Sequence, residues 1–159
     1  MTRRAVLAGS FDPITLGHLD ILRRGAALFD EVILAAGDNP AKRYRFDLET
    51  RLSLLRQVTA ELPNVRVDHF QGLLIHYCQQ VDAGVILRGL RGAKDFEFEF
   101  QIGQANRDMA PSIDSVFLLS DPEHLFVSSS LIKEIHDYGG DVSSYVPGPV
   151  LAALRDRAP

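Results

Sequence analysis

The chain of 159 residues has no tryptophan, one cysteine and no excess of positive charge. A lone cysteine, Cys78, cannot form an internal disulfide, so the sequence gives no sign of an oxidising compartment. The formal net charge of −4 argues against broad binding to nucleic acid or to a membrane surface, because both need a positive field. Any basic site must therefore be local, and its target must be small.

Long apolar runs are missing as well. The basic start of the chain leads into an apolar run at residues 5–9 only, which is too short for a signal peptide or a membrane span. We therefore expect a cytoplasmic protein that does not associate with membranes. There is no low-complexity segment, long linker or internal repeat, and this length suits one sizeable core, so we predict a single domain over residues 1–159.

The chain does contain short apolar runs that alternate with amphipathic segments. Buried strands are predicted at residues 5–8, 32–36, 85–87 and 116–119, and residues 65–70 alternate more, as in a strand nearer an edge. Between them, apolar spacing predicts helices at residues 19–29, 48–62, 74–81, 128–137 and 150–157, with Asp47 as the N-cap of the second. This alternation predicts an α/β fold in which a five-stranded parallel sheet has helices on both faces.

One segment gives a mixed signal. Apolar residues at 96, 98, 100 and 102 alternate with Glu97, Glu99 and Gln101, and this period of two is typical of a strand. A crossover is needed between the parallel strands on either side, however, and residues 104–107 contain several good helix formers. We therefore favour a helix.

Ligands of parallel sheets bind at the carboxyl ends of the strands, so the segments that follow the strands are the candidate sites. After the first strand, residues 9–18 read GSFDPITLGH. The loop offers the hydroxyl of Ser10, and His18 falls in the first turn of a helix, where free N–H groups and the helix dipole favour an anion. The segment is neither a P-loop nor a dinucleotide fingerprint. It resembles the opening signature of the nucleotidyltransferase superfamily marked by T/H-x-G-H.

Three later segments add further anion-binding side chains. Arg88 and Arg91 follow the predicted strand at residues 85–87, with Gly89 and Leu90 between them. Guanidinium groups bind phosphate bidentately, although a solvated basic loop is the alternative. Ser128, Ser129 and Ser130 open a helix and could face one anion, although plain N-capping is equally compatible. Lys42 follows the second strand and matters only because its loop leaves a strand end.

Together these motifs resemble those of bacterial phosphopantetheine adenylyltransferases. The matching segments are RGLR at residues 88–91, DFEFE at 95–99, NR at 106–107 and FVSSSLIKE at 126–134, in register along nearly the whole chain. The resemblance implies a Rossmann-like domain that assembles as a homohexamer. It implies transfer of AMP from ATP to 4'-phosphopantetheine, which yields dephospho-coenzyme A and pyrophosphate, with Mg²⁺ accompanying ATP.

The resemblance also implies roles for individual residues. The catalytic residues would be His18, Lys42, Arg88 and Arg91, with His18 stabilising the transition state. ATP would be bound by Ser10, Phe11, His18, Gly89, Leu90, Arg91, Glu99, His124, Leu125, Phe126, Val127, Ser128, Ser129 and Ser130. The acceptor would be bound by Ser10, Lys42, Leu74 and Arg88, and no residue is expected to serve as a dedicated metal ligand. His124, Phe98 and residues 43–45 depart from the family's usual sequence.

Three alternatives stay open at this point. The nearest is a nucleotidyltransferase of the same superfamily that acts on nicotinamide mononucleotide or a polyol phosphate; residues 88–106 and 128–130 fit it less well. A non-catalytic nucleotide-binding regulator is a second, and an intact His18 argues against it. A fragment of an aminoacyl-tRNA synthetase is a third, which would need a larger chain and a basic surface for RNA.

Overall fold

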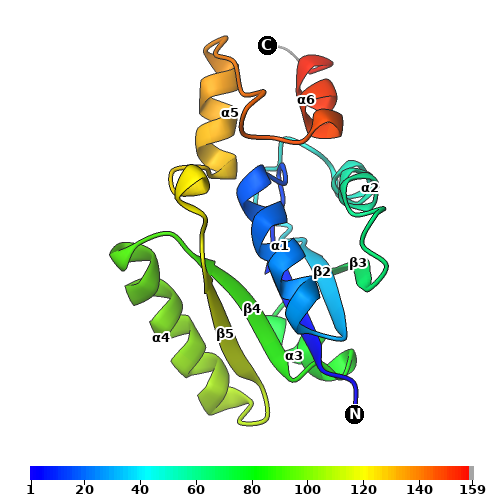
Figure 1. The fold of residues 1–159 in the computed structure, drawn as a ribbon, viewed down its shortest axis with the longest axis vertical. Helices are drawn as coiled ribbons and strands as arrows, with labels where there is room; N and C mark the ends of the chain where they lie inside the picture. The colour runs from blue at the N-terminus through cyan, green and yellow to red at the C-terminus, as the bar shows by residue number, and fades with distance from the viewer. Residues whose placement is uncertain (158–159) are drawn as a thin grey trace.

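Five parallel strands form one sheet in the computed structural model, which describes residues 1–157 (Figure 1). The strands are β1 (Arg4–Gly9), β2 (Glu31–Gly37), β3 (Val65–Phe70), β4 (Val85–Leu90) and β5 (Asp114–Leu119). Their order is β3-β2-β1-β4-β5, and all four pairs are parallel. The predicted five-stranded parallel sheet is confirmed, with β3 at an edge. The chain reverses its direction across the sheet next to β1, which is the switch point where α/β proteins bind ligands.

The connections between strands are helical, as predicted. The helices are α1 (Leu16–Leu28), α2 (Leu48–Val58), α3 (Leu74–Gln80), α4 (Ala93–Met109), α5 (Ser129–Asp137) and α6 (Gly148–Arg155), with a 3-10 turn, η1 (Pro122–His124), before α5. Asp47 is the N-cap of α2 and accepts a hydrogen bond from the Thr50 N–H. The predicted end of this helix at Leu62 was wrong. The helix ends at Val58 with Thr59 as its C-cap, and the Leu62 N–H then donates to the Thr59 carbonyl in a tighter turn just before Pro63.

Helices cover both faces of the sheet because successive strand residues point to opposite sides. On one face, Leu7 and Leu34 belong to a core that includes residues of α1, α2, α5 and α6. On the other, Val6 and Ile33 pack with residues of α3, among them Cys78, which is fully buried as predicted. The last pair of strands is covered differently, because α4 lies along β5 at the side of the molecule (Figure 1).

The segment with the mixed signal is the helix α4, so the preference for a helix is confirmed. Its alternating phenylalanines are not buried by the sheet: Phe96, Phe98 and Phe100 are about half exposed. Only Glu99 is classed as buried within α4. Residues two apart in a helix point in widely different directions, so one sheet cannot cover all of these rings.

A second correction concerns the segment after β4. Arg88, Gly89 and Leu90 were expected to follow the strand, but β4 continues through Leu90 and pairs with β5 up to Leu119. Gly89 allows this close packing, because a Cβ there would lie 2.9 Å from Cγ1 of Ile21 on α1. Arg88 therefore projects from a paired strand rather than from a loop, and Arg91 directly follows the end of that strand.

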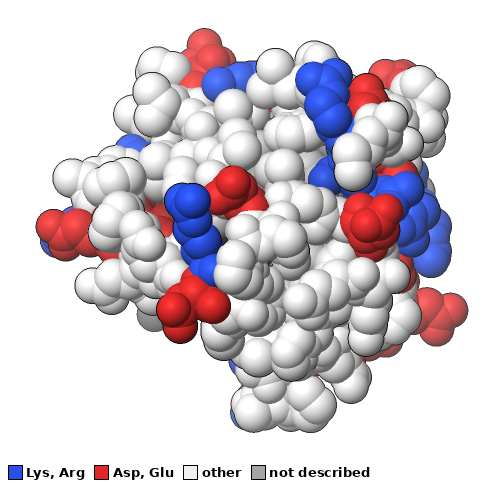
Figure 2. Space-filling view, turned by 90° about the horizontal axis from the view of Figure 1, so that it is seen from below, with Lys and Arg blue, Asp and Glu red and all other residues white. Residues whose placement is uncertain are grey.

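Two observations bear on large partners. No helix within residues 1–157 is long and apolar enough to cross a membrane. Figure 2 shows that, on the face seen from below, acidic and basic side chains lie in small separate groups with wide uncharged areas between them. That face has no continuous basic field of the kind that broad nucleic-acid binding requires.

Packing of α1 on the sheet can be tested with a matched pair of substitutions. Leu22 is fully buried, whereas Leu28 on the same helix is 50% exposed. We expect Leu22→Ala to lower the free energy of unfolding by about 2–5 kcal/mol, because it leaves a cavity in the core. Leu28→Ala should cost less than about 1 kcal/mol. Urea denaturation measures both values, and equal losses would contradict the described packing.

Candidate active site

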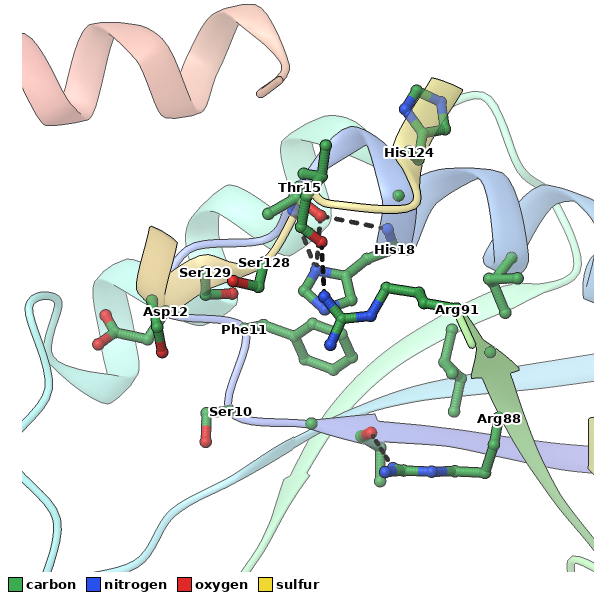
Figure 3. A pocket seen from close by; sticks show the side chains of 18 of the residues that line it. Ser10, Phe11, Asp12, Thr15, His18, Arg88, Arg91, His124, Ser128 and Ser129 are labelled. Atoms are coloured by element: carbon green, nitrogen blue, oxygen red, sulfur yellow. Dashed lines mark hydrogen bonds between the residues drawn. The ribbon is translucent and has the colours of Figure 1, made fainter. Parts of the chain in front are cut away.

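A cavity of about 480 Å³ opens at the carboxyl ends of β1 and β4, beside the switch point of the sheet. This volume lies in the range of small-molecule sites. The cavity collects residues that are far apart in the sequence. Most of those expected to bind ATP line it: Ser10, Phe11, His18, Gly89, Arg91, Glu99, His124, Val127, Ser128, Ser129 and Ser130. Lys42 and Arg88, which were expected to bind the acceptor, line it as well. Figure 3 shows that most of the labelled side chains come from the end of β1, from α1, from the end of β4 and from the start of α5.

His18 is held in one orientation by the start of α1. Thr15 is the N-cap, and its hydroxyl accepts a hydrogen bond from the His18 N–H at 3.3 Å. In return, the Thr15 N–H donates to Nδ1 of His18 at 3.0 Å (Figure 3). A backbone N–H can only donate, so Nδ1 is the unprotonated nitrogen and Nε2 carries the proton. The ring lines the cavity and therefore offers an N–H donor to an anion bound there.

The charge state of His18 follows from its surroundings. Burial lowers the pKa of His18, and the positive charges of Arg91 and Arg88 lower it further, to about 4. The imidazole is therefore neutral at physiological pH. The ring of Phe11 supports it from the side, with the two centroids 5.1 Å apart in an edge-on arrangement. Phe11 adopts a φ of 47°, which is rare for an aromatic residue and strained.

The two predicted arginines are both oriented by protein acceptors. Arg88 forms a bidentate pair with Glu99, at 2.6 and 2.8 Å, and donates to the Ala8 carbonyl at 3.0 Å. Arg91 donates to the Val127 carbonyl at 3.1 Å (Figure 3). Both oxygens of Glu99 are occupied in this way, so Glu99 acts on Arg88, although it also lines the cavity. The guanidinium groups are thus positioned in advance and keep further donors for a ligand.

The three serines divide their roles. Ser128 is the N-cap of α5 and accepts from the Leu131 N–H at 3.2 Å, so the N-capping interpretation holds for this residue. The Ser129 hydroxyl donates to the Pro13 carbonyl at 2.8 Å and joins α5 to the loop after β1. All three residues line the cavity, with the N-terminus of α5 and its partial positive charge.

A second cavity, of about 500 Å³, adjoins the first. Ser10, Lys42 and Arg88 line both cavities, and Leu74 lines only the second. These are the four residues that the sequence assigned to the acceptor. The structure therefore brings the expected ATP residues and the expected acceptor residues into neighbouring spaces with a shared basic border.

Some predicted ATP residues do not line either cavity. Leu90 is the last residue of β4, and Leu125 and Phe126 are about half exposed. The ring of Phe126 packs edge-on against Tyr145 at a centroid distance of 5.3 Å. The motif match included these three residues because of their neighbours in the sequence, and their roles in ATP binding stay predictions.

Several residues that support the site could not be assigned a role from the sequence. Asp12 is buried, accepts from the N–H groups of Arg45 and Phe46, and pairs with Lys133 at 3.2 Å. Arg51 is buried on α2 and contacts the loop after β1. Asp12 and Lys133 lie within motifs that were recognised, and this position could have identified them as residues of the site. Nothing in the spacing around Arg51 marked it.

The low pKa of His18 gives a first test of this geometry. We expect the imidazole to titrate near pH 4 in an NMR titration of the free protein, because burial and two guanidinium groups oppose protonation. Arg91→Gln should raise the midpoint toward 6.5, because it removes one of these charges. Since the folded pKa lies below the unfolded value, stability should fall as the pH drops from about 6.5 to 4.

The control for this titration is Arg107→Gln, a substitution of an exposed arginine near the far end of α4. It should leave the midpoint of His18 unchanged. A midpoint of 6.5 or above in the unsubstituted protein would contradict the described hydrogen bonds and burial.

Comparisons with known proteins show the family and the fold of this chain. The profile of a family described as cytidylyltransferase-like matches residues 6–135. A phosphopantetheine adenylyltransferase of Caldanaerobacter subterraneus subsp. tengcongensis is 47% identical over 98% of this chain and 97% of its own length. One from Dictyoglomus turgidum is 46% identical over 97% and 96%.

A solved structure from Vibrio parahaemolyticus, provisionally assigned as a nicotinate-nucleotide adenylyltransferase, aligns with a TM-score of 0.71. The alignment covers 99% of this chain and 93% of that one, at 19% identity, so it shows the shared fold alone. Identity near one half over almost the full length decides the closer relationship. The chain belongs to the phosphopantetheine adenylyltransferases of the cytidylyltransferase-like family.

Proposed function

We propose that this chain transfers the adenylyl group of ATP to 4'-phosphopantetheine, forming dephospho-coenzyme A and pyrophosphate. Two curated relatives that are nearly half identical over the whole chain carry the name of this activity. The observation that carries the proposal is the pair of adjoining cavities that share Ser10, Lys42 and Arg88. Two anionic substrates need two spaces and a basic border where their phosphates meet.

The chemistry is an in-line displacement at the α-phosphorus of ATP. A phosphate oxygen of the acceptor forms the new P–O bond, the bond between the α-phosphorus and the bridging oxygen breaks, and pyrophosphate leaves. Both reactants are already anionic, so the protein needs chiefly to position them and to neutralise charge. The cavity fits this need, because its oriented donors are fixed before the substrates arrive.

Within this scheme, His18 donates its Nε2–H to the reacting phosphoryl group. A neutral imidazole suits this role, since it donates a hydrogen bond without adding another positive charge beside Arg88 and Arg91. Arg91 and the N-terminus of α5 would neutralise charge on the phosphates of ATP, and Lys42 and Arg88 would hold the acceptor's phosphate. No carboxylate is needed as a base, because an ionised phosphate is itself the nucleophile.

We also propose that Mg²⁺ enters with ATP. The carboxylates that line the first cavity fit this view, because each already accepts from a neighbour: Asp12 from Lys133, Asp95 from the Arg91 N–H and Glu99 from Arg88. Among residues 1–157, no group of three or more Asp, Glu, His or Cys side chains gathers as a metal site. The ion would therefore be held mainly by phosphate oxygens and water, as Mg²⁺ often is.

The activity is tested by following pyrophosphate release from ATP with 4'-phosphopantetheine, beside nicotinamide mononucleotide and glycerol phosphate. We expect release with phosphopantetheine only. His18→Ala should lower kcat by roughly 10²–10³, the usual loss for one transition-state donor, with a small change in KM. Leu28→Ala, a substitution on the exposed side of the same helix, should leave kcat unchanged.

The other outcomes have distinct meanings. Release with a different acceptor would keep adenylyl transfer and overturn the acceptor. ATP binding without release for any acceptor would overturn the enzyme and favour a nucleotide-binding regulator.

We further propose that the chain assembles with copies of itself through α4, and the family resemblance implies a homohexamer. Phe98 is 61% exposed, and Met109 is exposed at the end of the helix. The rings of Phe96 and Phe100 pack in a tilted arrangement with their centroids 5.7 Å apart. Leu119 of the neighbouring strand is also exposed. Clustered apolar side chains of this kind usually mark an interface.

Light scattering after size-exclusion chromatography tests the assembly. We expect a homo-oligomer for the unsubstituted chain and a smaller species for Phe98→Glu, because a buried, unpaired carboxylate opposes association. Leu28→Glu places the same charge at an exposed position of α1 and should not change the mass. A monomer in the unsubstituted chain, or no change in Phe98→Glu, would contradict the proposal.

A further inference from the structure

A fully buried arginine lies behind the second cavity, and the proposed reaction gives it no role. The Arg51 side chain, on α2, has 0% exposure. Its Nη1 donates to the carbonyl oxygens of Ser10 at 2.9 Å and Gly37 at 3.0 Å, and its Nη2 pairs with Asp38 at 3.1 Å. A buried charge is costly unless it is paired and hydrogen-bonded, so this position requires a particular donor geometry.

The carbonyls that Arg51 contacts lie where β1 and β2 stop pairing. The register between these strands ends at Gly9 and Ala36. Beyond that point the Ser10 carbonyl leaves the ladder, and a buried carbonyl needs another donor. One guanidinium group reaches the ends of both strands at once, which an ammonium group with its different geometry would do poorly. Arg51 thus fixes the spacing between the two segments that border the second cavity.

Arg51 also holds the loop that carries Lys42. The guanidinium carbon lies 3.9 Å from the ring centroid of Tyr44, in a cation–π contact. The Tyr44 hydroxyl accepts from the Asn39 N–H at 2.8 Å, and the Asn39 carbonyl accepts from the Lys42 N–H at 2.9 Å. A chain of contacts therefore runs from the buried charge to the backbone of Lys42.

A third connection reaches the far wall of the same cavity. The second carboxylate oxygen of Asp38 accepts from Nε2 of Gln71 at 3.0 Å. The Asp38 N–H donates to the Phe70 carbonyl at 2.9 Å. Phe70, Gly72 and Leu74 line the cavity on this side. Arg51 is thus linked to three of the cavity's walls. On the ATP side its hydrogen bonds reach only the main-chain carbonyl of Ser10, which lines both cavities, and none of them reaches His18, Arg91 or α5.

We infer that Arg51 is a positioning residue for acceptor binding. It acts indirectly, by holding the loop that carries Lys42. This inference rests on the proposed function. It adds that the contacts of Arg51 with the loop of Lys42 set the affinity for the acceptor. His18, Arg91 and α5 are oriented by separate contacts. Loss of the Arg51 geometry should therefore weaken use of the acceptor and leave use of ATP almost unchanged.

The test is steady-state kinetics of Arg51→Lys, which keeps the charge and removes the planar fork. We expect KM for phosphopantetheine to rise about tenfold or more, as several hydrogen bonds are lost, while KM for ATP stays within about twofold. Arg56→Lys, an exposed substitution on the same helix, should leave both KM values unchanged. Equal rises in both values for Arg51→Lys would overturn the inference.

Two further variants keep the inference testable if Arg51→Lys does not fold, which circular dichroism would reveal. Tyr44→Phe keeps the ring and loses the hydroxyl, and should raise KM for phosphopantetheine by roughly three- to tenfold, with KM for ATP unchanged. In a Lys42→Ala background, Tyr44→Phe should add less than about a twofold change, because its effect passes through Lys42. If Tyr44→Phe raises KM for phosphopantetheine as much in the Lys42→Ala protein as in the wild type, the inference is overturned.

The wild-type chain separates the two proposals. Failure of the unsubstituted protein to use phosphopantetheine would overturn the proposed function itself. If the wild type is active but Arg51→Lys or Tyr44→Phe raises the KM values for phosphopantetheine and ATP equally, only the role of Arg51 is overturned.

Discussion

Main-chain carbonyls at the carboxyl edge of the sheet need donors where the strands stop pairing, and arginine side chains supply them. Arg88 donates to Ala8, Arg51 to Ser10 and Gly37, and Arg91 to Val127 of the segment before α5. The same guanidinium groups place positive charge around the cavities. Because one set of contacts both completes the backbone hydrogen bonding and forms the anion site, the fold and the site depend on each other.

This dependence explains how an acidic chain can bind polyphosphate substrates. The net charge is −4, yet the cavities gather Lys42, Arg88 and Arg91, and much of the acidic charge nearby is already paired. The neutral His18 completes the arrangement by adding a donor without adding a charge. Burial lowers its pKa most and the two arginines lower it further, so the cation cluster helps to keep the imidazole neutral.

The α4 helix links this cluster to the surface. Its buried residue, Glu99, holds Arg88, and its phenylalanines are exposed at the surface. The period-two pattern of this segment looked like a strand, but the structure shows a helix that turns the carboxylate of Glu99 inward and leaves its phenylalanines at the surface. Periodicity reflects burial within one chain and is misleading where a partner is expected to cover part of the surface.

Much of the site was predictable because its side chains stand in short segments next to strand ends. The strands, the direction of the sheet, Ser10, His18, Arg88 and the serine run followed from apolar runs, a helix start and local motifs. The sequence by itself determined the order of these elements and the kind of ligand they suit. Only the tertiary structure decided that β4 extends through Arg88, that Glu99 and Ala8 hold this arginine, and that Arg51 ties two strand ends behind Lys42. These contacts join residues that are distant in the chain. The sequence does not indicate which carbonyl oxygen an arginine side chain will contact in the folded protein.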